Sequence, residues 1–296
     1  MKVIEKHPII MIVIGIIGIS LSSIFVKYSE APSAVTAAYR LIITVILLTP
    51  AALGRKETRN EILSMTKKTL LLSALSGFML ALHFYLWFES LSHTSVASST
   101  TIVCTEVIWV SLGFCLLMKG RISKKAVLAI LITLIGSVMI ALSDSKNETN
   151  MIYGDILALL AAVAVAGYTL IGRLVRKNAS TTAYTYVVYI VCAAVLVCTS
   201  SVQGHKLFSY GLSPVIVGLL LAVFSTLLGH SIFSWCLKFF SPSFVSASKL
   251  LEPVVAAAFA AVLFSEIPAP LQLIGGALIL AGVVYYSRIE MKSEQK

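Results

Sequence analysis

The sequence contains little charge for a chain of its length. Of its 296 residues only 12% are Asp, Glu, Lys or Arg, whereas 58% are hydrophobic. A soluble domain has about 25% charged residues and about 45–50% apolar ones. The chain therefore has too little polar surface to cover a water-soluble globule, and we expect lipid to be its main solvent.

Motifs of metal binding, nucleotide use and catalysis are missing as well. The five cysteines lie in apolar segments without CxxC or Cys/His spacing, so we predict neither a disulfide nor a metal site. No Walker A loop is present, which argues against ATP as an energy source. The sequence also lacks the HExxH and GxSxG motifs of enzymes and the filter loop of a channel. We predict no catalytic residue and no cofactor, and a membrane-embedded enzyme or a channel is a less favoured alternative.

Acidic residues are scarce. The chain has 13 Asp and Glu residues against 23 Lys and Arg residues, which gives a net charge of +10. In a soluble protein this excess would suggest a nucleic-acid partner, but in membrane proteins basic residues collect in the cytoplasmic loops. With the N-terminus placed inside, the inner segments hold 18 Lys and Arg residues and the outer segments hold 3. This bias predicts a multi-pass protein of the plasma or inner membrane with both termini cytoplasmic, and no nucleic-acid partner.

Long hydrophobic runs fill the chain. A spanning helix needs about 20 mainly apolar residues. Ten such segments occur, joined by short connections: Ile9–Val26, Ser33–Leu53, Thr69–Phe88, Thr94–Met118, Ala126–Ser143, Ile156–Gly172, Thr181–Ser201, Ser213–Leu237, Pro242–Ser265 and Ala269–Ser287. The first run, which no small-residue cleavage site follows, is interpreted as a spanning helix rather than a signal peptide.

An internal repeat appears when the chain is shifted by 146 residues. Four identical pairs then coincide: Glu106 with Glu252, Ser95 with Ser241, Leu91 with Leu237 and Gly136 with Gly282. Five helices per repeat is an odd number, which inverts the second half relative to the first. We therefore predict an all-α integral membrane protein in which ten transmembrane helices form two inverted five-helix repeats, residues 1–149 and 150–296, around a central cavity.

Two glutamates lie where lipid should not tolerate them. Glu106 and Glu252 fall near the middle of equivalent helices, and a charged side chain there costs about 2.5–3.5 kcal/mol on insertion scales. Either they are polar anchors between helices or they bind solute or protons at a transport site. Pro253 removes a backbone donor beside Glu252, and such a helix break is tolerated mainly where the backbone faces protein or water.

Two cations accompany these carboxylates. Lys249 precedes Glu252 by three residues on the same helical face, so it forms either a static ion pair with Glu252 or one that exchanges with a carboxylate of the solute. Arg40, in the outer half of the second helix, needs an anion. It either reaches the outer surface or pairs with Glu30 or Glu89, or it meets an anionic group of the solute.

Other candidates are aromatic or titratable near neutral pH. His230 and His83 are either packing residues or site residues, since an imidazole changes charge near pH 7. Tyr85, Trp87 and Trp235 are candidates for cavity walls, or they belong to an interfacial belt.

Several short motifs together resemble one family. The segments Ser22–Lys27 and Ala31–Pro32 to Tyr39–Arg40, the stretch Ser90–Ser98, and above all Gly229–His230, Trp235–Lys238, Ser241–Ser243 and Leu251–Val254 are similar to those of EamA-type members of the drug/metabolite transporter superfamily. The resemblance covers nearly the whole chain. It implies ten helices, two inverted repeats, a central cavity and transport of small organic solutes, often export of amino acids or related metabolites. Val107 stands where the first repeat of the family often has a proline, which argues against a symmetric kink.

These observations favour a secondary transporter of small polar metabolites that works by alternating access. Export of amino acids or related compounds is the leading expectation, and a facilitative uniporter or an importer is the alternative. Its partners would be the solute and the bilayer, with protons as a coupling ion and a homodimer left open.

Overall fold

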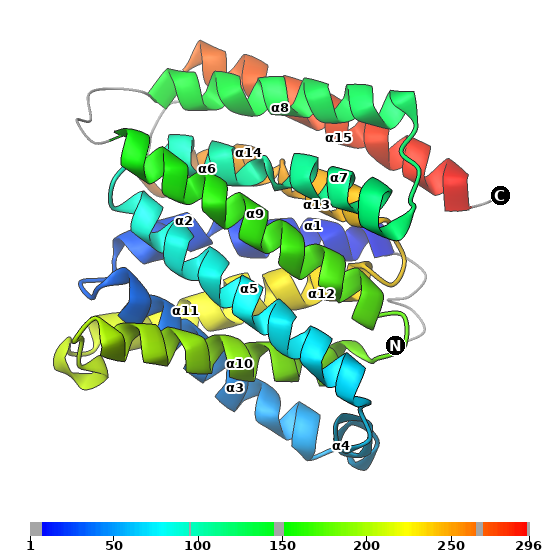
Figure 1. The fold of residues 1–296 in the computed structure, drawn as a ribbon. Helices are drawn as coiled ribbons and strands as arrows, with labels where there is room; N and C mark the ends of the chain where they lie inside the picture. The colour runs from blue at the N-terminus through cyan, green and yellow to red at the C-terminus, as the bar shows by residue number, and fades with distance from the viewer. Residues whose placement is uncertain (1–7, 95, 145–150, 265–268, 295–296) are drawn as a thin grey trace.

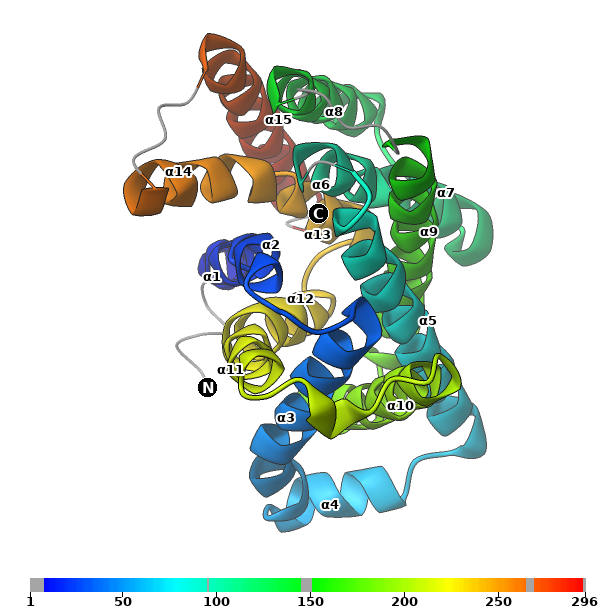
Figure 2. The same ribbon diagram turned by 90° about the vertical axis from the view of Figure 1, so that its left-hand side faces the viewer.

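The computed structural model describes residues 8–94, 96–144, 151–264 and 269–294, and the regular elements of this part of the chain are all helices. The main helices run side by side in one bundle, with α1 beginning and α15 ending at the same end (Figure 1). Seen along the bundle, α3, α5 and α10 lie on one side and α8 and α15 on the other (Figure 2).

The described helices have the following bounds. They are α1 (Pro8–Ser20), α2 (Ser22–Lys27), α3 (Ser33–Leu53), α4 (Lys56–Leu63), α5 (Lys67–Leu91), α6 (Val96–Cys104), α7 (Glu106–Met118), α8 (Lys124–Asp144), α9 (Met151–Val175), α10 (Thr181–Val202), the 3₁₀ turn η2 (Leu207–Ser209), α11 (Ser213–Leu220), the π-helix η3 (Leu221–His230), α12 (Ser231–Cys236), α13 (Pro242–Lys249), α14 (Glu252–Phe264) and α15 (Pro270–Glu294).

Each of the ten predicted segments is mainly helical over its described residues. Within the described chain, eight of them are long and apolar enough to cross a membrane by length and composition. The two segments that do not meet these criteria are α8 and the pair α13–α14. Helix α13 has 8 residues and α14 has 13. Exposed apolar side chains, such as Leu128, Leu131 and Ile135, cover one face of α8. The loop predicted between the second and third segments also contains the short surface helix α4, none of whose residues is buried.

The fourth and ninth segments are both broken, at equivalent positions. Helix α7 spans Glu106–Met118 and α14 spans Glu252–Phe264, so both bounds differ by 146 residues. The expectation that Val107 would prevent a symmetric kink was therefore wrong. In the first half Thr105 takes the place of proline, because its hydroxyl donates to the carbonyl of Ile102 at 2.6 Å and the backbone tightens into a 3₁₀-type turn.

The eighth segment is also irregular. The sequence predicts one continuous helix there, but ten residues between α11 and α12 form the π-helix η3. The Thr226 hydroxyl donates to the Leu221 carbonyl five residues back at 3.1 Å, which satisfies an oxygen of the widened helix. Such π segments occur often at functional sites.

The two repeats meet along α8 and α15. A Cβ atom at Gly136 would lie 2.6 Å from the carbonyl oxygen of Gly275, and one at Gly282 would lie 3.1 Å from that of Ala129. The two contacts are equivalent under the repeat, because Gly136 corresponds to Gly282 and Ala129 corresponds to Gly275 at the offset of 146 residues. Only glycine allows such a close backbone crossing, and the reciprocal pair indicates that a pseudo-two-fold axis passes between these helices.

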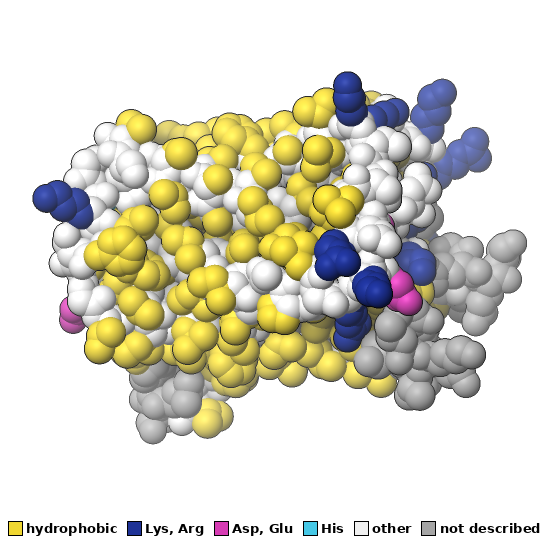
Figure 3. Space-filling view, turned by 90° about the horizontal axis from the view of Figure 1, so that it is seen from below, with side chains coloured by type: hydrophobic (Ala, Val, Ile, Leu, Met, Phe, Trp, Pro, Cys, Tyr) yellow, Lys and Arg dark blue, Asp and Glu magenta, His cyan; other side chains and the backbone are white. Residues whose placement is uncertain are grey.

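The surface is divided into an apolar middle and a basic end. Hydrophobic side chains cover the middle of the face in Figure 3, whereas most of its Lys and Arg side chains gather at the end where α15 terminates. This is the surface of a multi-pass integral membrane protein.

Candidate functional site

A small cavity lies in the interior and is lined by both halves of the chain. From residues 1–149 it receives Arg40, His83, Trp87 and Glu106, and from residues 150–296 it receives His230, Lys249 and Glu252. Its volume open to water is about 40 Å³, enough for no more than a few water molecules. This space is smaller than a small organic metabolite.

An ion pair joins the two halves at this cavity. The Lys249 Nζ atom lies 2.9 Å from Glu106 Oε1, and the two side chains are only 9% and 4% exposed. The sequence had suggested Glu252 as the partner, since it lies three residues further on the same helix. Lys249 pairs instead with the other repeat, because the break between α13 and α14 ends the helical register that relates it to Glu252.

Among the described residues, the Glu252 carboxylate is left without a partner. It is half-buried at the first position of α14, beside Pro253, and in the described part of the chain its carboxylate forms neither an ion pair nor a hydrogen bond. Its backbone carbonyl accepts a bond from the Ser20 hydroxyl of α1 at 3.3 Å. Glu106 holds the same position in α7, so each glutamate lies in the first turn of a half-helix, whose positive end favours a carboxylate.

Arg40 is a buried cation that has no carboxylate partner in the described chain. It is 1% exposed, its Nε donates to the Thr226 hydroxyl at 2.7 Å, and one terminal nitrogen donates to the Ser22 hydroxyl at 3.4 Å. The guanidinium carbon lies 3.9 Å from the centroid of the Phe84 ring. The predicted contacts with the outer surface, Glu30 or Glu89 are therefore wrong, because the side chain turns inward to the cavity.

The two histidines and Trp87 form an aromatic wall. The ring planes of His83 and Trp87 differ by 7° with centroids 6.1 Å apart, and the centroid of His230 lies 6.2 Å from that of His83. His83 Nδ1 lies 3.0 Å from the carbonyl of Ala161 on α9 and so must donate to it. This bond fixes the tautomer and orientation of His83, which makes it a packed wall residue.

Apart from Glu106 Oε1, which is ion-paired with Lys249, three buried polar atoms of the cavity lining have no hydrogen-bond partner among the described residues. They are Trp87 Nε1, Thr100 Oγ1 and His230 Nδ1. Unpartnered polar groups are costly inside a protein and point to a ligand or to solvent. The sequence analysis missed Thr100 and Ser22, although the run Ser98–Thr101 within an apolar segment was a signal that could have found Thr100.

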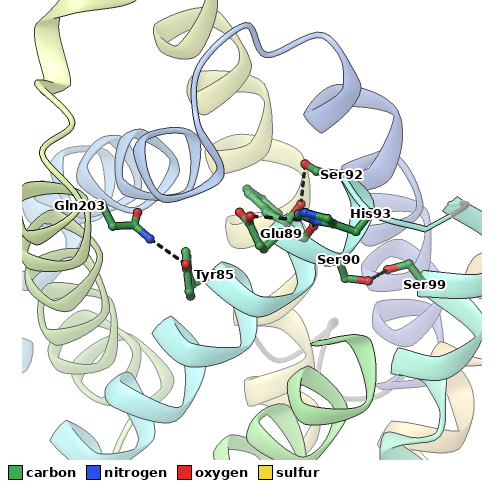
Figure 4. A network of polar contacts seen from close by, with 8 residues as sticks. Tyr85, Glu89, Ser90, Ser92, His93, Ser99 and Gln203 are labelled. Atoms are coloured by element: carbon green, nitrogen blue, oxygen red, sulfur yellow. Dashed lines mark hydrogen bonds and ion pairs between the residues drawn. The ribbon is translucent and has the colours of Figure 1, made fainter. Parts of the chain in front are cut away.

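Two predicted wall residues lie away from the cavity. Tyr85 belongs to a polar network at the end of α5, where its hydroxyl accepts a bond from Gln203 at 2.7 Å (Figure 4). In the same region His93 contacts Glu89, its neighbour one turn back. Trp235 packs against Phe239 with ring centroids 4.4 Å apart. Neither Tyr85 nor Trp235 is among the described residues that line the cavity.

A polar, charge-bearing cavity between two inverted helical repeats defines a multi-pass membrane transporter fold. The chain belongs to the EamA-like transporter family, whose sequence profile matches residues 6–142 and again residues 152–288. The two matches differ by 146 residues at both bounds, which is the offset of the internal repeat.

The chain is also similar to curated relatives and to a solved structure. The chain is 26% identical over 213 residues to the pseudopaline exporter CntI of Pseudomonas aeruginosa strains UCBPP-PA14 and PAO1, covering 72% of this chain and 73% of the relative. A crystal structure superimposes with a TM-score of 0.78 over 98% of this chain and 99% of its own, at 15% identity. That likeness concerns the fold alone.

Proposed function

We propose that this transporter exports a small polar metabolite, an amino acid or a related compound, by alternating access between residues 1–149 and 150–296. The observation that carries the proposal is the cavity to which both halves contribute charged side chains, with Arg40 and Glu106 from one half and Lys249 and Glu252 from the other. Buried charges in a membrane protein are expensive and mark solute or ion pathways.

The ion pair between the halves supports alternating access. Lys249 and Glu106 hold the repeats together while their charges satisfy each other. When the halves separate, each charge needs a new partner, and a solute that carries both an acid and an amine supplies two. Export is favoured over import because the similar protein CntI is an exporter.

Flux in proteoliposomes tests the proposal. A thermal-shift screen against amino acids, nucleosides and other metabolites first selects a ligand, since specific binding raises the apparent stability. We expect saturable uptake of that ligand, faster when the vesicles are preloaded with it. An imposed proton gradient separates a proton-coupled carrier, whose flux it drives, from a facilitative uniporter. Flux that rises linearly with concentration would support a channel, and chemical conversion without flux would support an enzyme.

The proposed orientation places both termini in the cytoplasm, on the strength of the basic loops. We expect a cysteine that replaces the exposed Lys206 to react with a membrane-impermeant maleimide from outside intact cells. A cysteine that replaces Arg59 on α4 should react only after the cells are opened. The unaltered chain, with its five native cysteines, gives the background. The reverse pattern of labelling would overturn the orientation.

A further inference from the structure

The charges that line the cavity do not all cancel locally. Lys249 and Glu106 neutralise each other at 2.9 Å. Arg40 and Glu252 remain, and among the described residues neither has an ionic partner within 4 Å. Arginine stays protonated in proteins, so Arg40 cannot relieve its burial by losing its charge. A permanent cation that is 1% exposed and has no ionic partner within 4 Å among the described residues is placed to receive an anion from outside the protein.

The neutral contacts of Arg40 orient the guanidinium without neutralising it. Thr226 and Ser22 accept two of the five hydrogen bonds that a guanidinium can donate, and Phe84 covers one face. The other buried arginine of the chain differs. Arg176, 4% exposed, donates to the backbone carbonyls of Ser234 and Ala179, which are the contacts of a structural anchor.

Unpartnered donors line the same cavity as Arg40. The Trp87 indole N–H and the Thr100 hydroxyl are 5% and 6% exposed by residue and have no acceptor in the described chain. A guanidinium fork, an indole N–H and a hydroxyl form a donor set for an oxyanion. These unpartnered donors are a separate observation from the unpaired charge of Arg40, and they also point to an anionic ligand.

We propose that Arg40, Trp87 and Thr100 form the subsite for a carboxylate of the transported solute. The inference rests on the proposed function, because it takes the cavity to be the solute site. A carboxylate carries one negative charge and matches the single unpaired cation. A phosphate monoester carries about −1.5 to −2 at neutral pH and would place excess negative charge beside Glu106 and Glu252. The substrate class is therefore a small carboxylic acid, with Glu252 left to receive a cationic group.

Matched ligands test the subsite in the purified, full-length protein. Each common amino acid is compared with its carboxamide, and inorganic phosphate is assayed separately, by thermal shift at constant ionic strength. We expect the free acids to raise the melting temperature and their carboxamides to bind about tenfold to hundredfold more weakly, as for a lost charged hydrogen bond. Protection by the carboxamides that equals that of the acids, protection by phosphate alone, or no protection by any acid would overturn the proposal.

Variants separate a solute receptor from a structural anchor. Arg40→Met should abolish the shift produced by the acids while the ligand-free protein melts at or above the wild-type temperature, because an uncompensated charge has been removed. Arg40→Lys should keep part of the shift. Arg176→Met is the matched control, expected to lower the melting temperature and to retain the shift. An Arg40→Met protein that melts lower yet keeps the acid-dependent shift would make Arg40 an anchor.

Failure of this proposal can be distinguished from failure of the carrier function. Saturable proteoliposome flux of a solute without an acid group, unchanged in Arg40→Lys, would remove the carboxylate subsite and leave the transporter intact. Binding of acids without any flux would retain the subsite and remove the proposed transport cycle.

Discussion

Replacing Lys249 with methionine is expected to lower the free energy of unfolding by about 3–5 kcal/mol. The substitution leaves the Glu106 carboxylate, whose side chain is 4% exposed, without the ammonium group that lies 2.9 Å from it. The charge must then remain unpaired in the protein interior, or the group must take up a proton, and both cost free energy. Denaturant or thermal unfolding of the protein in detergent measures the loss.

A double substitution tests whether the loss comes from the unpaired charge. Lys249→Met combined with Glu106→Gln removes both charges and should recover most of the stability, since replacing a buried pair by neutral groups is often neutral. Lys177→Met, at an exposed lysine, serves as the control and should change stability by about 0.5 kcal/mol or less. Equal free energies of unfolding for the Lys249→Met protein and the wild type would contradict a stabilising role for this ion pair.

Glu252→Gln is expected to fold and insert normally but to transport about tenfold to hundredfold more slowly. The carboxylate has no protein partner in the described chain, so its loss removes no structural contact. If it binds the solute or a proton, the amide removes the charge on which that binding depends. The initial rate of flux, compared with the melting temperature, separates the two effects.

Glu57→Gln provides the matched control for this experiment. Glu57 is exposed on α4 and lies outside the cavity lining, so both flux and stability should stay at the wild-type level. Wild-type transport kinetics in Glu252→Gln would remove this glutamate from the mechanism.

Much of the architecture could be predicted because it depends on local composition. Hydrophobic runs mark the helices, and the repeat offset follows from pairs such as Gly136 and Gly282, which recur because both halves need a small residue at the same crossing. The positions of Glu106 and Glu252 also follow from counting residues along a helix. Seven of the nine candidate side chains line one cavity. Their role in binding stays a prediction.

The remainder depends on contacts between distant segments. The rule for neighbours on one helix selected Glu252 as the partner of Lys249, but the helix is broken between them and the true partner comes from the other repeat. The helix break at Thr105 has no proline beside it, so the sequence does not indicate it. For Arg40 the sequence left the outer surface, Glu30, Glu89 and an anionic group of the solute open, because its hydroxyl partner Thr226 is 186 residues away and cannot be inferred from local spacing.

The reciprocal glycine crossing of α8 and α15 has a consequence for the energetics of the proposed transport cycle. With two halves of opposite topology, exchanging their conformations converts a protein open to one side into one open to the other. Perfectly identical halves would therefore make the two states equal in energy. Any resting preference must arise where paired positions differ, as where Lys249 corresponds to Val103 and His230 to Phe84, which all lie at or beside the cavity. Exchanging the two residues of one such pair should therefore shift the equilibrium between the states open to the two sides of the membrane. The measurement is which side is open in the absence of solute.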